Sequence, residues 1–68
     1  MRVSPIRDAR KRLDITQPQL AIKVKVSQGH ISGVENGKEN PSPDLAKRLA
    51  KVLGIPVMEI LFPEDQEK

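Results

Sequence analysis

The sequence predicts an all-α fold of five short helices packed into one small bundle. Apolar residues recur at helical spacing in successive windows of the chain, and helix-start signals such as Ser-Pro precede two of these windows. No segment has the alternating pattern of a half-buried strand. With 68 residues the chain is short enough for a single domain, which we place at 1–62, followed by an acidic flexible tail at 63–68.

The first helix is expected to begin at Ser4-Pro5, because serine caps a helix and proline is tolerated in its first turn. Its inner stripe contains Ile6, Arg10 and Leu13, and Asp14-Ile15 ends it.

The second helix is expected to follow Thr16, since Gln19 three residues later completes a capping-box pattern. The segment 25–27 reads as a tight turn into a third helix over 28–36, which Gly37 ends as a left-handed glycine.

The third helix is expected to have a buried and an exposed side. At about 100° per residue, Ile31, Val34 and Glu35 cluster inward, whereas Gly29 and Gly33 lie at the centre of the opposite side. The predicted layout is two short helices joined by a tight turn, and the outer face of the second helix has small, uncharged residues. Proteins use this layout to place a helix in the DNA major groove.

Two further helices complete the predicted bundle. Ser42-Pro43 repeats the Ser-Pro start, and an apolar stripe continues to Leu53, where Gly54 stops the helix. Pro56 opens a short fifth helix, and Pro63 ends it.

The net charge of +3 hides an asymmetry along the chain. Residues 1–58 hold 11 Lys/Arg against 5 Asp/Glu, whereas residues 59–68 hold 1 against 4. A basic body indicates a polyanionic partner, most simply nucleic acid, although ordinary solvated charge remains the alternative.

The amino-acid composition argues against several other classes of protein. There is no cysteine and one histidine, so we expect no disulfide framework, no metal site and no cofactor. A single aromatic residue argues against the stacking platforms that bind single strands. No apolar run approaches the ~18 residues of a membrane helix, so we expect no membrane partner. The absence of cysteine favours a cytoplasmic protein. No effector domain is visible in the sequence, so we expect no small-molecule ligand.

Several short motifs stand at a characteristic spacing. They are Arg10, Gln17-Pro18-Gln19-Leu20-Ala21, Val26-Ser27, Ile31-Ser32, Glu35-Asn36-Gly37 and Asn40-Pro41-Ser42. Over the range 6–61 the pattern resembles the phage repressor/Cro-like (XRE family) helix-turn-helix DNA-binding domain. The resemblance implies a lambda-repressor-like fold. It also implies a sequence-specific transcriptional regulator, with repression as the preferred role, whose partner is a double-stranded DNA operator.

The resemblance also implies a set of DNA contacts. Base contacts fall at Gln28, Gly29, Ser32 and Gly33. Phosphate contacts fall at Gln17, Ser27, Asn36, Lys38 and Asn40. The amide of Gln28 can bond to adenine N6 and N7, whereas the alternative is a solvent-facing residue with no partner.

Arg10 and Glu35 both lie on inner stripes, where an unpaired charge would cost several kcal/mol. We therefore expect them to form an ion pair, as the family does at these positions. His30 lies at the edge of the buried side, and a packing role is preferred there over base reading.

The sequence departs from the family pattern in the helix-turn-helix. Lys25 stands at a turn position that is usually glycine because the backbone there is left-handed. Gly29 and Gly33 stand where base-contacting side chains are usual. Either they let the helix sit deeper in the groove, or the domain has relaxed specificity or uses this face for a protein. Pro18 removes one N–H from the start of the second helix.

The C-terminal apolar residues supply more apolar surface than one short helix needs to bury. A homodimer through Val57, Met58, Leu61 and Phe62 is expected, and the alternative is that they all close the monomer core. The second functional reading is a protein-interaction module, such as an antitoxin or anti-repressor partner with weak or nonspecific DNA binding.

Overall fold

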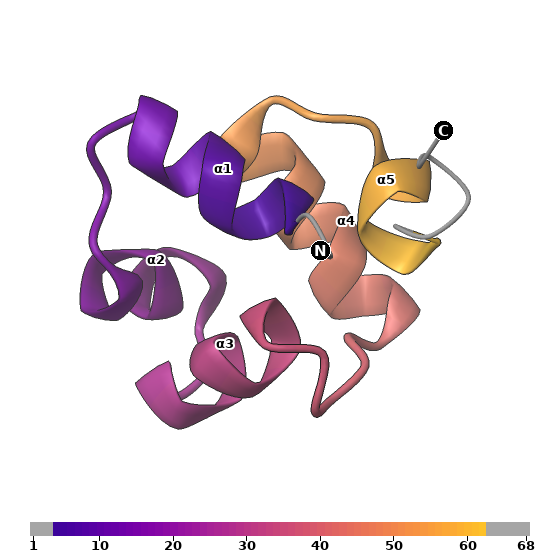
Figure 1. The fold of residues 1–68 in the computed structure, drawn as a ribbon, viewed down its shortest axis with the longest axis horizontal. Coiled ribbons are helices and arrows are strands. Elements are labelled where there is room, and N and C mark those ends of the chain that lie inside the picture. The colour runs from indigo at the N-terminus through magenta and orange to yellow at the C-terminus, as the bar shows by residue number, and fades with distance from the viewer. Residues whose placement is uncertain (1–3, 63–68) are drawn as a thin grey trace.

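The computed structural model describes residues 4–62, and within them the chain forms five helices and no strand (Figure 1). The helices are α1 (Pro5–Arg12), α2 (Gln17–Val24), α3 (Gln28–Glu35), α4 (Pro43–Leu53) and α5 (Val57–Leu61). The all-α, five-helix prediction is confirmed, although α3 ends one residue earlier than expected, with Asn36 as its C-cap. The predicted acidic tail at 63–68 lies outside the described residues. None of the described helices is long and apolar enough to cross a membrane.

Side-chain caps define where the first four helices begin. The hydroxyl groups of Ser4, Thr16, Ser27 and Ser42 each accept a hydrogen bond from the backbone N–H three residues ahead. At α2 the capping box is complete, because the N–H of Thr16 also donates to Gln19 Oε1 at 2.9 Å. These caps satisfy N–H groups that a helix start leaves without intrahelical partners.

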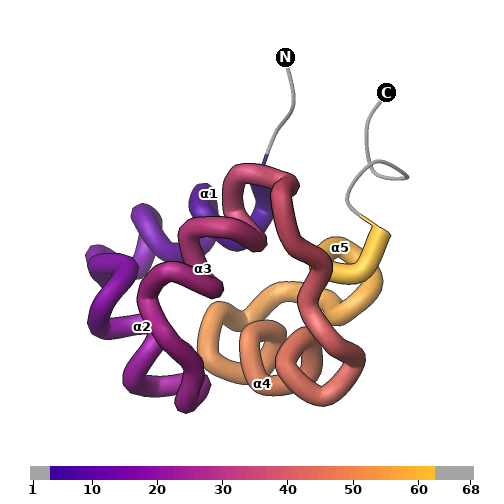
Figure 2. Tube along the Cα trace, turned by 90° about the horizontal axis from the view of Figure 1, so that it is seen from below, coloured from indigo at the N-terminus to yellow at the C-terminus, as the bar shows by residue number. Residues whose placement is uncertain are grey.

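One apolar core joins all five helices. Its largest fully buried side chains are Leu20, Val24, Ile31 and Leu49. Helix α2 packs against α3 and α4, and α1 and α4 both pack against α5, so α4 connects the helix-turn-helix to the rest of the bundle. Figure 2 shows α2 and α3 together on one side of the molecule and α4 and α5 on the other.

The turn between α2 and α3 has the left-handed backbone that the family resemblance implies. Lys25 is left-handed, with φ 64° and ψ 44°, and Val26 N–H donates to the carbonyl of Ala21 at 3.0 Å. Arg48 of α4 reaches the end of α2, and its Nη1 donates to the carbonyl of Val24 at 2.7 Å. This contact ties the end of α2 to α4 and satisfies a carbonyl that the helix end leaves unpaired.

Candidate nucleic-acid interface

Helices α2 and α3 meet at a close crossing. Ala21 and Ile31 are almost fully buried, whereas Gln28 and Gly29, at the start of α3, are exposed. A larger side chain at position 21 would not fit without moving a helix, because interiors are densely packed. Helix α3 therefore packs against α2 on one side, and its first two residues are open to solvent.

Glu35 is the polar centre beneath this surface. Arg10 Nε donates to Glu35 Oε2 at 2.7 Å, and Arg10 Nη2 donates to Oε1 at 3.2 Å. The Glu35 side chain has no exposed surface, and that of Arg10 is 11% exposed. Arg10 Nη1 also donates to the carbonyl of Ile15 at 3.0 Å. The pair links α1 to the C-terminal end of α3.

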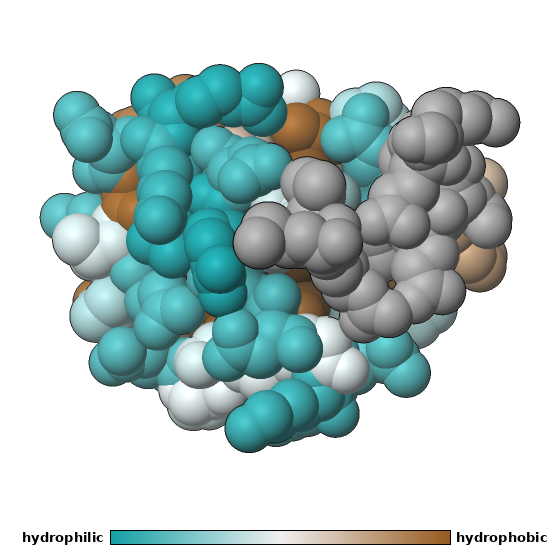
Figure 3. Space-filling view, in the orientation of Figure 1, coloured by the Kyte–Doolittle hydropathy of each residue, from teal (hydrophilic) through white to brown (hydrophobic). Residues whose placement is uncertain are grey.

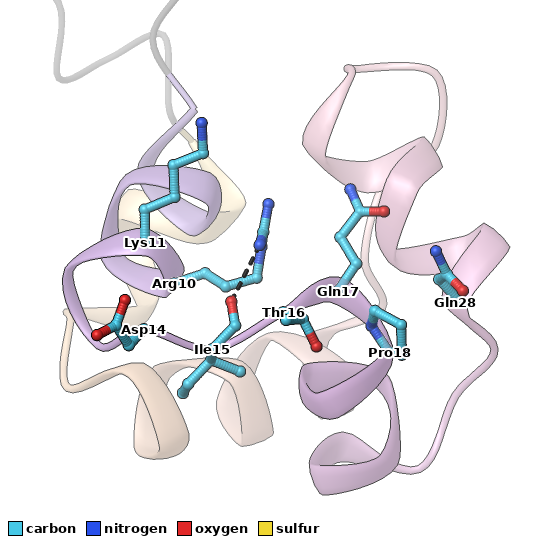
Figure 4. Close-up of a pocket in the computed structure, with 8 residues that line it drawn as sticks. All are labelled: Arg10, Lys11, Asp14, Ile15, Thr16, Gln17, Pro18 and Gln28. Carbon is cyan, nitrogen blue, oxygen red and sulfur yellow. Dashed lines mark hydrogen bonds between the residues drawn. The ribbon is translucent and has the colours of Figure 1, made fainter.

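Gln17 takes part in the same network. Its Nε2 donates to Glu35 Oε1 at 3.0 Å, so one amide N–H of this expected phosphate contact is used inside the domain. Figure 4 shows Gln17 and Gln28 beside each other, at a shallow depression of about 550 Å³ between the end of α1 and the starts of α2 and α3. The lining residues are Arg10, Lys11, Asp14, Ile15, Thr16, Gln17, Pro18 and Gln28. Lys11 adds a positive charge that sequence analysis did not assign to the site.

Asn36 and Ser32 form the edge of α3 that faces α1. Arg7 Nη2 donates to Asn36 Oδ1 at 2.8 Å, and Asn36 Nδ2 donates to Ser32 Oγ at 3.4 Å. Arg7 Nε also lies 3.6 Å from Glu35 Oε1. The predicted base contact at 32 and the predicted phosphate contact at 36 are thus neighbours, and both are connected to the Arg7 guanidinium.

The two glycines of α3 differ in their surroundings. A Cβ built on Gly29 would meet nothing within 4 Å, whereas a Cβ on Gly33 would lie 2.7 Å from Glu39 Oε2. Gly33 is consequently buried, which corrects the expectation that both glycines lie open on the outer face. The side chain of Glu39 covers Gly33 and pairs with His30 Nδ1.

Glu39 is a residue of this surface that sequence analysis missed. Its side chain comes from the loop after α3, so no periodicity within α3 could reveal it. The one signal in the sequence was Gly33 itself, because a helical glycine away from a turn leaves room for another group to approach closely. The His30 side chain is partly exposed at 31%, and its ring contacts this carboxylate at the rim of α3.

The other expected phosphate contacts lie just before and just after α3 in the chain. Ser27 is exposed, and its hydroxyl accepts the N–H of His30 at 3.1 Å. Lys38 and Asn40 are exposed in the loop after α3. The backbone N–H of Lys38 donates to the carbonyl of Gly33 at 2.8 Å, which leaves the side chain as the free donor of this residue. In Figure 3 the surface over α3 is near neutral in hydropathy and is bordered by hydrophilic side chains.

The expected dimer residues divide into two kinds. Met58 and Phe62 are 55% and 48% exposed, whereas Val57 and Leu61 pack partly against the core. The exposed apolar surface of α5 is therefore smaller than the sequence pattern suggests.

Comparison with known proteins defines the family. The model of the helix-turn-helix family matches residues 6–60. An uncharacterized HTH-type transcriptional regulator of Methanothermobacter thermautotrophicus is 40% identical over 62 residues, covering 91% of this chain and 90% of the relative. A regulator of the same description from Methanocaldococcus jannaschii is 41% identical over 54 residues, covering 79% and 82%. The immunity repressor protein of Bacillus phage phi105 is 36% identical over 59 residues, covering 87% of this chain and 41% of the repressor.

The chain therefore belongs to the helix-turn-helix family, and the resemblance to its XRE branch is confirmed. This class consists of DNA-binding regulators of transcription and is not an enzyme class.

Proposed function

We propose that this protein binds a duplex DNA operator as a homodimer, places the N-terminal part of α3 in the major groove and represses transcription. The observation that carries the proposal is the position of Gln28. It is exposed at the start of α3, a helix that packs against α2 and buries Ile31 in the core on its other side. An amide in this position can bond to the N6 and N7 atoms of an adenine.

The phosphate contacts are proposed on the two flanks of α3. On one flank, Gln17 uses one N–H of its amide on Glu35 and keeps the other, because a primary amide carries two. Lys11 lies at the same depression and adds charge. On the other flank, Lys38 and Asn40 are exposed, and Asn36 keeps one amide N–H beyond its bond to Ser32. Ser27 adds a hydroxyl at the N-terminus of α3, where the helix dipole favours an anion.

The homodimer is proposed to form through α5. Met58 and Phe62 supply the exposed apolar contact, and Val57 and Leu61 border it. A symmetric pair would present two copies of α3 to half-sites about 34 Å apart, one helical turn of DNA. A contact of this size is small, so we expect the dimer to assemble fully only on DNA.

A salt titration on duplex DNA tests the binding mode. If Lys and Arg side chains replace counterions on the phosphates, log K falls linearly with log salt at a slope of roughly −5 to −8 for the dimer. Selection from random duplexes should return a near-palindromic motif. No duplex binding at low salt would overturn the proposal and favour the protein-interaction module, and a non-palindromic single site would overturn the homodimer.

A further inference from the structure

The carboxylate of Glu39 is fixed on the outer side of α3 by contacts from three directions. The backbone N–H of Glu39 donates to the carbonyl of Gly33 at 3.1 Å, which anchors the loop to the helix. The side chain then folds back across Gly33, where the missing Cβ leaves the space that it occupies. His30 Nδ1 holds Oε1 from the neighbouring position of the helix.

One oxygen of this carboxylate remains open to a further donor. Among the described residues, His30 alone hydrogen-bonds to the Glu39 side chain, and it does so through Oε1. The side chain is 49% exposed, and Oε2 is the atom nearest to Gly33 on the helix surface. A carboxylate accepts hydrogen bonds and donates none, so Oε2 is an oriented acceptor on the face where Gly29 is open.

We propose that Glu39 is a specificity-determining residue of the DNA interface, whose Oε2 accepts a hydrogen bond from the exocyclic N4 amino group of a cytosine. This inference rests on the proposed major-groove docking of α3. Of the four bases, cytosine and adenine present a donor in that groove, and adenine presents the acceptor N7 beside it. A carboxylate therefore favours cytosine and is repelled by the acceptors N7 and O6 of guanine.

His30 acts in this scheme as a positioning residue. Its ring N–H donates to Oε1, which holds the carboxylate over Gly33 with Oε2 as the oxygen nearest to that glycine. A fixed acceptor discriminates between bases better than a mobile one, because its orientation entropy is already lost before binding. Loss of the ring should therefore weaken base selection without removing the carboxylate.

Selection from random duplexes, run in parallel on the wild type and Glu39→Gln, tests the proposal. The wild type should require a cytosine at one position of each half-site, with its replacement by guanine weakening binding on the order of 10-fold. The Glu39→Gln variant should lose this requirement and shift toward adenine, since an amide pairs with adenine N6 and N7. The other positions of the motif should keep their preferences.

Two further variants separate base reading from simple charge. Gly33→Ala adds a methyl group that must displace the Glu39 carboxylate, so it should relax the same position as Glu39→Gln. Asp44→Asn removes a carboxylate charge from the exposed first turn of α4, outside the proposed interface, and should leave that position unchanged. Thermal melts check that all variants are folded.

Three results would count against the inference in different ways. An equal gain in affinity of Glu39→Gln for every duplex would mean that Glu39 only repels phosphates, and the inference would be overturned. Unchanged base preference in Glu39→Gln would overturn it as well, while leaving the proposed function intact. Absence of wild-type binding to any duplex would overturn the proposed function and this inference together.

Discussion

Arg10 and Glu35 stand 25 positions apart in the chain and form a two-point ion pair inside the domain, with Arg10 Nε 2.7 Å from Glu35 Oε2. Gln17 adds a third hydrogen bond to the same carboxylate. One buried group thereby holds together α1, the start of α2 and the end of α3. The pair fixes the relative positions of these three segments, and removing one partner should cost more than the intact pair contributes to stability.

Arg10→Met should destabilise the domain by roughly 3 kcal/mol or more, because it leaves the buried Glu35 charge without its main partner. Urea unfolding followed by circular dichroism measures this loss. The double variant Arg10→Met/Glu35→Leu is the control, since removal of both charges should restore much of the stability. A free energy of unfolding for Arg10→Met within about 0.5 kcal/mol of the wild-type value would contradict the role of the pair.

Acid should destabilise the domain through Glu35. Burial raises the pKa of this carboxyl, but hydrogen bonds from Arg10 and Gln17 outweigh burial. The charges of Arg10 and Arg7 act in the same direction, so the pKa lies below its ordinary value of 4.5. A lowered pKa contributes stability above pH 4.5, and this contribution is lost as the pH falls through the folded-state value.

Unfolding measured from pH 7 down to pH 3 tests this dependence. The slope of stability against pH below about 4.5 should be smaller in Glu35→Gln than in the wild type. Asp44→Asn is the comparison, because the pKa of Asp44 is also lowered, by a hydrogen bond and the charge of Arg48, but on the surface. A Glu35→Gln curve parallel to that of the wild type would show that another group causes the acid sensitivity.

Lys25→Gly should stabilise the domain by about 1 kcal/mol, because the residue has φ 64° and a side chain in that region is strained. Lys25→Ala is the matched control. It keeps a Cβ, so its stability should stay within about 0.5 kcal/mol of the wild type while the same charge is removed. If both variants were equally stabilised, charge rather than backbone strain would be the cause.

Local signals made the fold predictable from sequence. Thr16 and Gln19 mark the start of α2 because both partners of the capping box lie within four residues. The left-handed Lys25 was expected from the resemblance to the family, in which glycine is usual at this position. The left-handed Asp14, at φ 59°, was missed because nothing beside it marks a special backbone. Helix boundaries that depend on residues close together in the sequence can be predicted from the sequence.

Contacts between distant segments were harder to predict. The approach of Arg48 to Val24 and the position of Glu39 over Gly33 depend on the path of loops and on the crossing of helices. Helical periodicity places a residue on a face, but it does not identify the group that covers that face. Arg10 and Glu35 were the exception, because burial of two opposite charges leaves few alternatives to pairing.

Gln28→Ala should lower the affinity for the selected operator by ~1–3 kcal/mol and leave nonspecific duplex binding nearly unchanged, because it removes a base contact and no charge. Lys38→Ala is the contrasting variant. It should weaken binding to all duplexes alike and make the salt dependence less steep by about 0.9 for each phosphate that is no longer neutralised. Titrations of both variants on specific and random duplexes, at two salt concentrations, separate the two roles. Equal losses for Gln28→Ala on both duplexes would mean that the exposed amide at the start of α3 contacts the backbone, and the reading of bases would then depend on Ser32 and the loop after α3.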